Sequence, residues 1–160
     1  MSVGEVEKKH VKSVILEFIA KHMEVEDKEA LSREIEDAMI IIGSRVFVNC
    51  TPHEIRFTDG RVVKGSVTLA KILSATTKQV VVDRIGDIEL VRTVFEPSEL
   101  GREFVKTMIW ECKNEVLLIG SIIAAQTYGY LVVSPICTPE TARLPPDKRV
   151  VYSKLWNCYW

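Results

Sequence analysis

The chain has 160 residues, 47% hydrophobic and 27% charged, a composition that supports a globular core and excludes a disordered chain. With 21 Lys and Arg against 22 Asp and Glu, the net charge is −1, so no overall charge draws it to nucleic acid or to an anionic membrane. Only five residues are Asn or Gln, which favours a thermophilic source.

The cysteines, the N-terminus and one uncharged stretch indicate whether the protein binds a metal and where in the cell it is located. Cys50, Cys112, Cys137 and Cys158 form no CxxC pair, so the spacing does not fit a zinc site, and no metal or cofactor is expected. Buried free thiols are the expected state, with a disulfide as the alternative. The charged N-terminus is not expected to be a signal peptide, and the uncharged stretch 116–139 is broken by Gly, Pro and polar residues. We therefore expect a cytoplasmic protein (in the host cytoplasm if viral) that does not enter a membrane.

The N-terminal segment is expected to form a helical hairpin over residues 5–42. Apolar residues recur at helical spacing in 11–22 and 31–42, Asp27 is placed to cap the second helix, and Gly43 to end it. The segment carries six basic and ten acidic residues, so it lacks the basic face of a DNA reader, and nucleic acid is not an expected partner. We divide the chain into this hairpin, 1–44, and an α/β domain, 45–160. The apolar stripes predict burial against the domain or a second copy, and we expect a homo-oligomer, most simply a two-fold dimer.

The remainder alternates short strands with helices. Asp59-Gly60 predicts a tight hairpin turn, as does the Ile85-Gly86-Asp87 stretch, whose neighbouring carboxylates are expected to form a solvated hairpin end. Pro135 is expected to end a strand. Strands are expected at 45–49, 54–57, 61–63, 79–83, 88–95, 115–119, 130–134 and 150–156, the last at a sheet edge, and helices at 98–112 and 121–128. This order predicts an α/β (α+β) fold with a mostly antiparallel mixed sheet, flanking helices and the preceding helical hairpin.

One polar segment stands at the end of the first of these strands. Asn49 and Thr51 are suited to bonding loop backbone, and Pro52 fixes one φ angle, so His53 is held on a rigid corner. An imidazole in that place suits a ligand contact or a general base. The alternative is a structural corner whose side chains satisfy backbone groups.

This stretch resembles the N-x-T-P-H-x-I opening of a family of small uncharacterised proteins from phages, archaeal mobile elements and bacterial genomes. Members continue with a hairpin, a strand similar to residues 90–93, and segments similar to 116–121, 122–126 and 130–135. The resemblance covers about residues 45–137 and departs at Cys50, at Gly120 and in an insert around 98–113. The family has no established activity, so the resemblance marks Asn49, Thr51, Pro52 and His53 for testing without assigning them chemistry.

A second candidate is Gly120-Ser121, at an expected strand-to-helix junction. Free N–H groups at such a junction suit a phosphate or carboxylate, whereas a plain helix cap is the alternative. No GxGxxG, P-loop or GxSxG pattern surrounds it.

Three functions remain open from the sequence, and whether the protein is an enzyme is not decided. The first is binding of a small anionic or nucleotide-like ligand by Asn49, Thr51, His53, Gly120 and Ser121. The second is a virus- or mobile-element-encoded interaction or assembly protein without a small-molecule site. The third is a hydrolase in which His53 is the catalytic residue.

Overall fold

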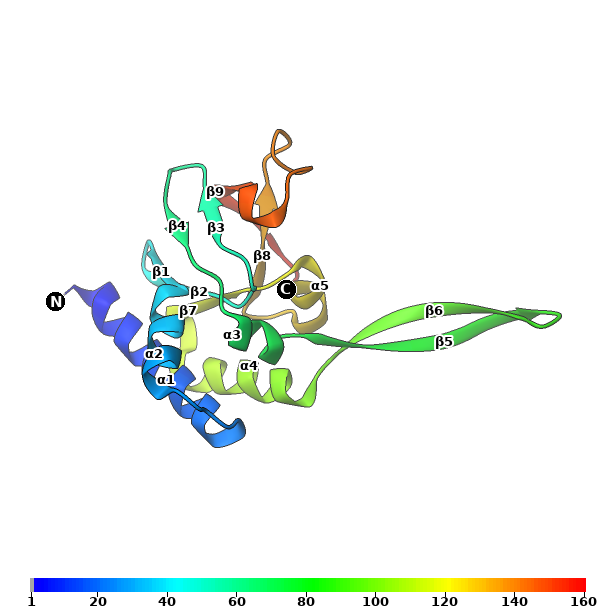
Figure 1. Ribbon diagram of the computed structural model, residues 1–160, viewed down its shortest axis with the longest axis horizontal. Coiled ribbons are helices and arrows are strands. Elements are labelled where there is room, and N and C mark those ends of the chain that lie inside the picture. Colours follow the sequence, from blue (N-terminus) through cyan, green and yellow to red (C-terminus); the bar gives the residue numbers. More distant parts are fainter. Residues whose placement is uncertain (1) are drawn as a thin grey trace.

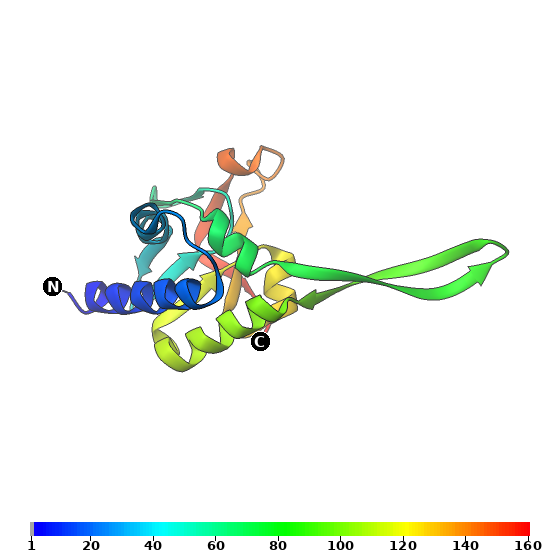
Figure 2. The same ribbon diagram turned by 60° about the horizontal axis from the view of Figure 1, so that its bottom comes forward.

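The computed structural model describes residues 2–160, which form a sheet covered by helices and one long hairpin that projects from it (Figures 1 and 2). The helices are α1 (Val3–His22), α2 (Lys28–Asp37), α3 (Val67–Ile72), α4 (Glu99–Cys112) and α5 (Ile122–Tyr128), with 3₁₀ turns at Lys113–Glu115 and Pro146–Lys148. The strands are β1 (Met39–Ile42), β2 (Arg45–Asn49), β3 (Ile55–Phe57), β4 (Val62–Val63), β5 (Ala75–Ile85), β6 (Ile88–Pro97), β7 (Val116–Ile119), β8 (Val132–Cys137) and β9 (Val150–Cys158).

The main sheet has seven strands in the order β1-β2-β7-β8-β9-β3-β4. The pairs β2–β7, β7–β8 and β3–β9 are parallel, while β1–β2, β8–β9 and β3–β4 are antiparallel. The α/β class with a mixed sheet is therefore confirmed, but the sheet is evenly mixed rather than mostly antiparallel. The α5 crossover accounts for part of the difference, because a helix between neighbouring strands lets β7 and β8 run in the same direction.

Two strand predictions at the C-terminal end are wrong. Strand β9 lies between β8 and β3 rather than at an edge. Strand β8 continues through Pro135 to Cys137, and the β8–β9 register is irregular between these two residues. An irregularity of this kind accommodates a proline, which has no N–H for a regular ladder.

The second N-terminal helix ends five residues earlier than its apolar spacing predicts. Asp27 does cap it, because its carboxylate accepts a hydrogen bond from the Ala30 N–H at 3.0 Å. After Asp37 the chain turns into β1, which pairs with β2 through a tight turn at Gly43, where φ is +62°. The three isoleucines of β1 favour the strand, since branched side chains pack well on a pleated surface.

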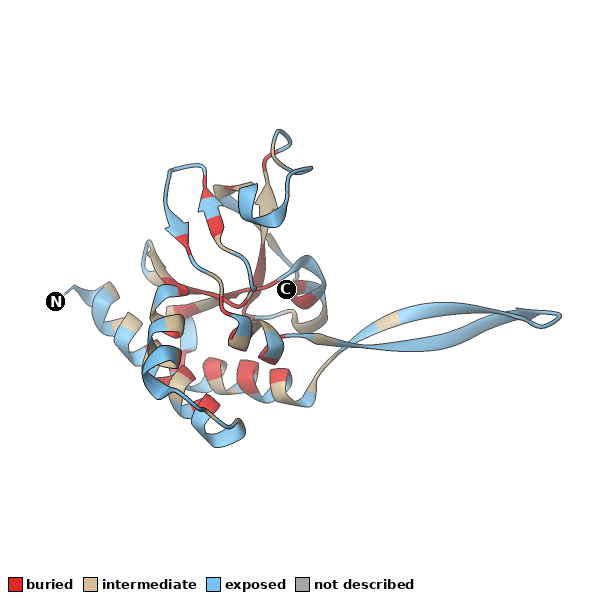
Figure 3. Cartoon of the chain, in the orientation of Figure 1, coloured by how far each residue is buried: buried red, intermediate tan, exposed pale blue. Residues whose placement is uncertain are grey.

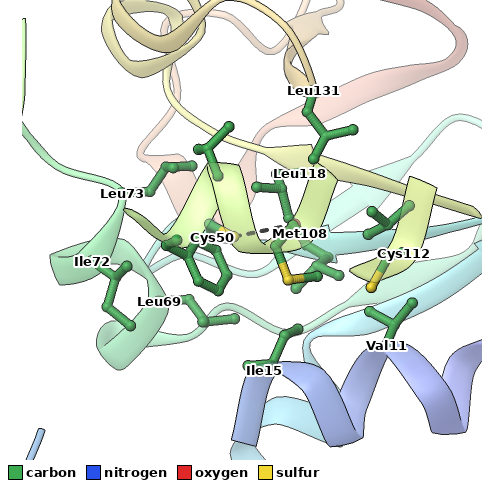
Figure 4. Packing of buried hydrophobic residues seen from close by; sticks show 14 of the residues in the cluster. Val11, Ile15, Cys50, Leu69, Ile72, Leu73, Met108, Cys112, Leu118 and Leu131 are labelled. Atoms are coloured by element: carbon green, nitrogen blue, oxygen red, sulfur yellow. Dashed lines mark hydrogen bonds between the residues drawn. The ribbon is translucent and has the colours of Figure 1, made fainter. Parts of the chain in front are cut away.

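Helices and sheet share one core (Figure 4). The core joins side chains from α1, α3, α4, β7 and the segment before β8: Val11, Ile15, Leu69, Ile72, Met108, Cys112, Leu118 and Leu131. The apolar stripe of α1 is thus covered within the chain, which removes the reason for placing a second copy against it. Among residues 2–160, no helix has the length and apolar character that crossing a membrane requires.

Candidate functional site

The corner after β2 is organised by the side chain of Asn49, which is completely buried. Its Nδ2 donates to the carbonyls of His53 at 2.9 Å and Lys64 at 3.1 Å. Its Oδ1 accepts from the Thr51 N–H at 3.1 Å and from the Thr51 hydroxyl at 2.7 Å. The hydrogen-bonding capacity of the amide is therefore used to hold backbone and Thr51.

The same corner is held from its other side by the link between β4 and α3. The Ser66 N–H donates to the Thr51 carbonyl at 2.8 Å. A Cβ on Gly65 would lie 2.6 Å from the backbone nitrogen of His53, so this close approach requires glycine. The backbone of the corner is consequently fixed at both faces.

The side chain of His53 points into none of this network. It is exposed, and its ring makes no hydrogen bond to any of residues 2–160. Pro52, rather than His53, lines the neighbouring cavity. The structure thus separates Asn49 and Thr51, which hold the corner, from a solvated histidine.

The second candidate pair lies beside the corner, because β2 and β7 are parallel neighbours. Asn49 is in register with Ile119, and the Cys50 N–H donates to the Ile119 carbonyl at 2.9 Å. The hydroxyl of Ser121 caps α5 by accepting from the Ala124 N–H at 3.1 Å. Two sequence motifs about 70 residues apart therefore meet at the carboxyl ends of these strands.

A cavity of about 290 Å³ opens at this meeting point. Its walls come from the corner, α3, the start of β5, the end of β6 and α5: Cys50, Thr51, Pro52, Ala70, Leu73, Ser74, Ala75, Phe95, Ser121, Ile123 and Ala124. None of these residues is charged, and the polar side chains are the hydroxyls of Thr51, Ser74 and Ser121. The lining suits a small, mostly apolar group and contains no cation to offset an anion.

Cys50 also lines this cavity, but its thiol is not a nucleophile. Burial raises its pKa, and its Sγ lies 3.6 Å from the Val48 carbonyl, to which it donates (Figure 4). Since the thiolate is the reactive form, a buried neutral thiol is inert. No cluster of three or more His, Cys, Asp or Glu that could hold a metal ion occurs in the described part of the chain.

The most unusual feature of the molecule is the hairpin of β5 and β6, residues 75–97, which we call the arm. It stands away from the body and is exposed along almost all of its length (Figure 3). Ten residues of strand reach about 33 Å. The following apolar side chains of the arm are exposed: Val80, Val81, Val82, Ile85, Ile88, Leu90, Val91 and Phe95.

Apolar side chains occupy both faces of the arm. Cross-strand partners share a face, so Val80 beside Arg92 belongs to the face of Leu90 and Ile88, while the pair Val81 and Val91 belongs to the opposite one. Antiparallel sheets ordinarily pair one apolar face with one polar face. An arm apolar on both faces is therefore incompletely covered by its own chain.

The root of the arm is anchored by Tyr128 at the end of α5. Its hydroxyl donates to the Ser74 carbonyl at 2.7 Å and accepts from the Ser98 N–H at 3.2 Å, joining the segments just before β5 and just after β6. A Cβ on Gly101 would clash with this hydroxyl and with the backbone carbonyl of Ile72, so glycine is needed beside it. The arm is thus attached firmly at its root and free beyond it.

Sequence reasoning predicts a short hairpin at 79–83 and 88–95 and does not find the arm. The signal is present in the β-branched and aromatic residues that recur on both sides of the glycine turn, over strands of 11 and ten positions. These strands are about twice the usual length of about five to six residues. Gly86 has φ +59° at the first turn position, as a tight hairpin requires. Exposure of both faces depends on what packs on the arm, which a single sequence does not encode.

Comparisons with protein-family models, with curated proteins and with solved structures found no match to this chain. The resemblance of the Asn49–His53 segment to the phage and archaeal family therefore remains a prediction.

Proposed function

We propose that the protein is an assembly protein whose arm joins copies of the chain into a homo-oligomer. The observation that carries the proposal is the arm itself, a solvated hairpin with apolar side chains on both faces. A two-stranded hairpin by itself is marginally stable in water, and an exposed apolar surface of this kind marks an interaction site. A second arm is the surface best matched to cover it.

The size of the arm supports the same proposal. Residues 75–97 make 23 residues, and one side of a standard protein interface comprises about 20–30 residues. The arm carries Lys78, Arg84 and Arg92 against four acidic residues, so it lacks the positive charge that would favour nucleic acid over protein. A protein surface that carries both charges is therefore a better partner for the arm than nucleic acid.

Light scattering of the full chain and of an arm-deleted variant tests the proposal. In the variant, residues 77–95 are replaced by Asn-Gly, which joins the cross-strand partners Thr76 and Glu96 by a favoured two-residue turn. We expect a mass at least twice 18.1 kDa for the full chain and a monomeric mass for the variant, with native circular dichroism in both. A monomeric full chain at 100 µM overturns the proposal, as does an arm-deleted variant of unchanged oligomeric state.

Ligand binding is the second candidate, and the observation that favours it is the 290 Å³ cavity at the carboxyl ends of β2 and β7. Ligand sites of α/β sheets occur at such edges. A panel of nucleotides, nucleosides and small apolar metabolites is tested by thermal shift, where a ligand at 100 times its Kd stabilises by about 2.7 kcal/mol. Ile123→Trp, which enlarges a partly exposed side chain of the cavity wall, abolishes a shift that arises there. The hydrolase reading has less support, because no nucleophile among residues 2–160 bonds the His53 ring.

The proposal includes a cytoplasmic location, that of the host if the source is a virus. Its support is the four free cysteines, since a reducing compartment keeps thiols unpaired. Fractionation of the source cells tests this location.

A further inference from the structure

We infer that the tip of each arm binds in a groove on α4 of a second copy, in a two-fold exchange that is reciprocal. The inference rests on the proposed assembly function and adds the surface that receives the arm.

The receiving surface, which we call the α4 groove, has a volume of about 440 Å³. Its apolar residues come from the end of β6, from α4 and from α5: Pro97, Val105, Ile109, Trp110 and Tyr128. Two cations, Arg102 and Lys106, also line it. The indole of Trp110 is 73% exposed, although aromatic side chains of this size are usually covered. Arg102 and Lys106 are exposed and form no ion pair within residues 2–160.

The tip of the arm complements this groove in apolar character and charge. Ile85 and Ile88 flank the turn and are 59% and 61% exposed, so each tip presents two branched apolar side chains. Around them stand Asp83, Asp87 and Glu89, with Arg84 paired to Glu89 at 3.5 Å, which leaves the tip a net charge of −2. The groove supplies +2 from its two free cations. Glu99 and Glu103 lie on the same helix but do not line the groove.

The position of the groove at the root of the arm allows the contact between tip and groove to close a two-fold dimer. Pro97 is both the last residue of β6 and part of the groove, so the groove lies at the root of the arm. When two arms lie antiparallel across a two-fold axis, each tip reaches the root of the other arm. The same contact is then made twice, as a closed isologous dimer requires. Between the two grooves, one apolar face of each arm covers an apolar face of the other.

Charge-reversal variants of the full chain test whether the tip of the arm binds in the α4 groove. Arg102→Glu with Lys106→Glu reverses the groove, and we expect the dimer Kd measured by sedimentation to rise about tenfold or more, since four surface ion contacts become repulsive. Arg143→Glu with Lys148→Glu is the matched control. It makes the same charge change on the exposed loop before β9, at the far side of the molecule from α4, and leaves Kd unchanged (Figure 1).

Adding Asp83→Arg and Asp87→Arg to the groove variant restores opposite charges, and we expect Kd to recover most of the loss. The emission of Trp110, read against Trp110→Phe, shifts to shorter wavelength as the full chain dimerises. An unchanged Kd in the groove variant, or no recovery of Kd when the two tip substitutions are added to it, overturns the inference that the tip binds in the α4 groove. A dimer that persists in the groove variant but is lost without the arm leaves the assembly function intact, whereas a full chain that never dimerises removes both.

Discussion

Replacing Asn49 by alanine tests whether the corner after β2 is a structural device. The substitution removes four hydrogen bonds and leaves the Lys64 carbonyl and the Thr51 N–H without a partner, while the Thr51 hydroxyl and the His53 carbonyl keep the bond of 3.2 Å between them. A single buried group left unsatisfied costs about 1–3 kcal/mol, and nearby water recovers part of the total. We therefore expect a loss of about 3 kcal/mol in the free energy of unfolding. For a domain of this size, that loss lowers Tm by about 6–12 °C.

Urea denaturation followed by circular dichroism measures the loss, with His53→Ala as the comparison. His53 is exposed and its ring is unbonded within residues 2–160, so its substitution is expected to change stability by less than about 0.5 kcal/mol. Asn49→Asp preserves the shape but turns a carboxylate toward the His53 and Lys64 carbonyls, so it is expected to cost at least as much as alanine. Equal losses in Asn49→Ala and His53→Ala, or a loss below about 1 kcal/mol in Asn49→Ala, would refute this account of the corner.

The other predictions concern the arm's root and the thiols. Gly101→Ala places a methyl group against the Tyr128 hydroxyl and is expected to cost about 1–3 kcal/mol in thermal unfolding, whereas Glu103→Ala, at an exposed position of the same helix outside the groove, is near neutral. Cys158 is exposed and should react with a thiol reagent in the native protein, while Cys50 and Cys112 react only after unfolding, as mass spectrometry of labelled peptides would record. Burial raises the pKa of Cys112 to about 12 from 9.0, so its neutral thiol contributes stability that is complete below pH 9 and is lost as pH rises from 9 toward 12. The alkaline fall of Tm should be shallower in Cys112→Ala, and an equal slope would contradict the assignment.

The sequence predicts those elements that have a local signal. The helix caps at Asp27 and Ser121 each accept the N–H three residues ahead, because short polar side chains satisfy free helix N–H groups without tertiary help. The Asn49 corner is predictable for the same reason, since Asn and Thr bond nearby backbone. Its junction with Ser121 follows from β2 and β7 being parallel neighbours, a pairing between distant segments that no local pattern encodes.

The failures share a different physical cause, which is that one local pattern fits two structures. Gly43 suits the end of a helix as well as a hairpin turn, and Met39–Ile42 satisfies helical spacing while favouring a strand by its branched side chains. Tertiary pairing with β2 selects the strand. The arm differs again. Its glycine turn between two strand segments predicts a hairpin correctly, but this local pattern does not specify whether the body or another chain covers the hairpin.

Hydrogen exchange of the arm amides at two protein concentrations tests the central claim most directly. A lone arm has two open edges and no core, so its amides are expected to exchange within seconds when the protein is dilute and monomeric. At 100 µM, assembly through the arms should slow exchange over residues 75–97 by at least about tenfold while β2 and β7 remain unchanged. Fast exchange of the arm at both concentrations would contradict the claim that the arm joins copies of this protein.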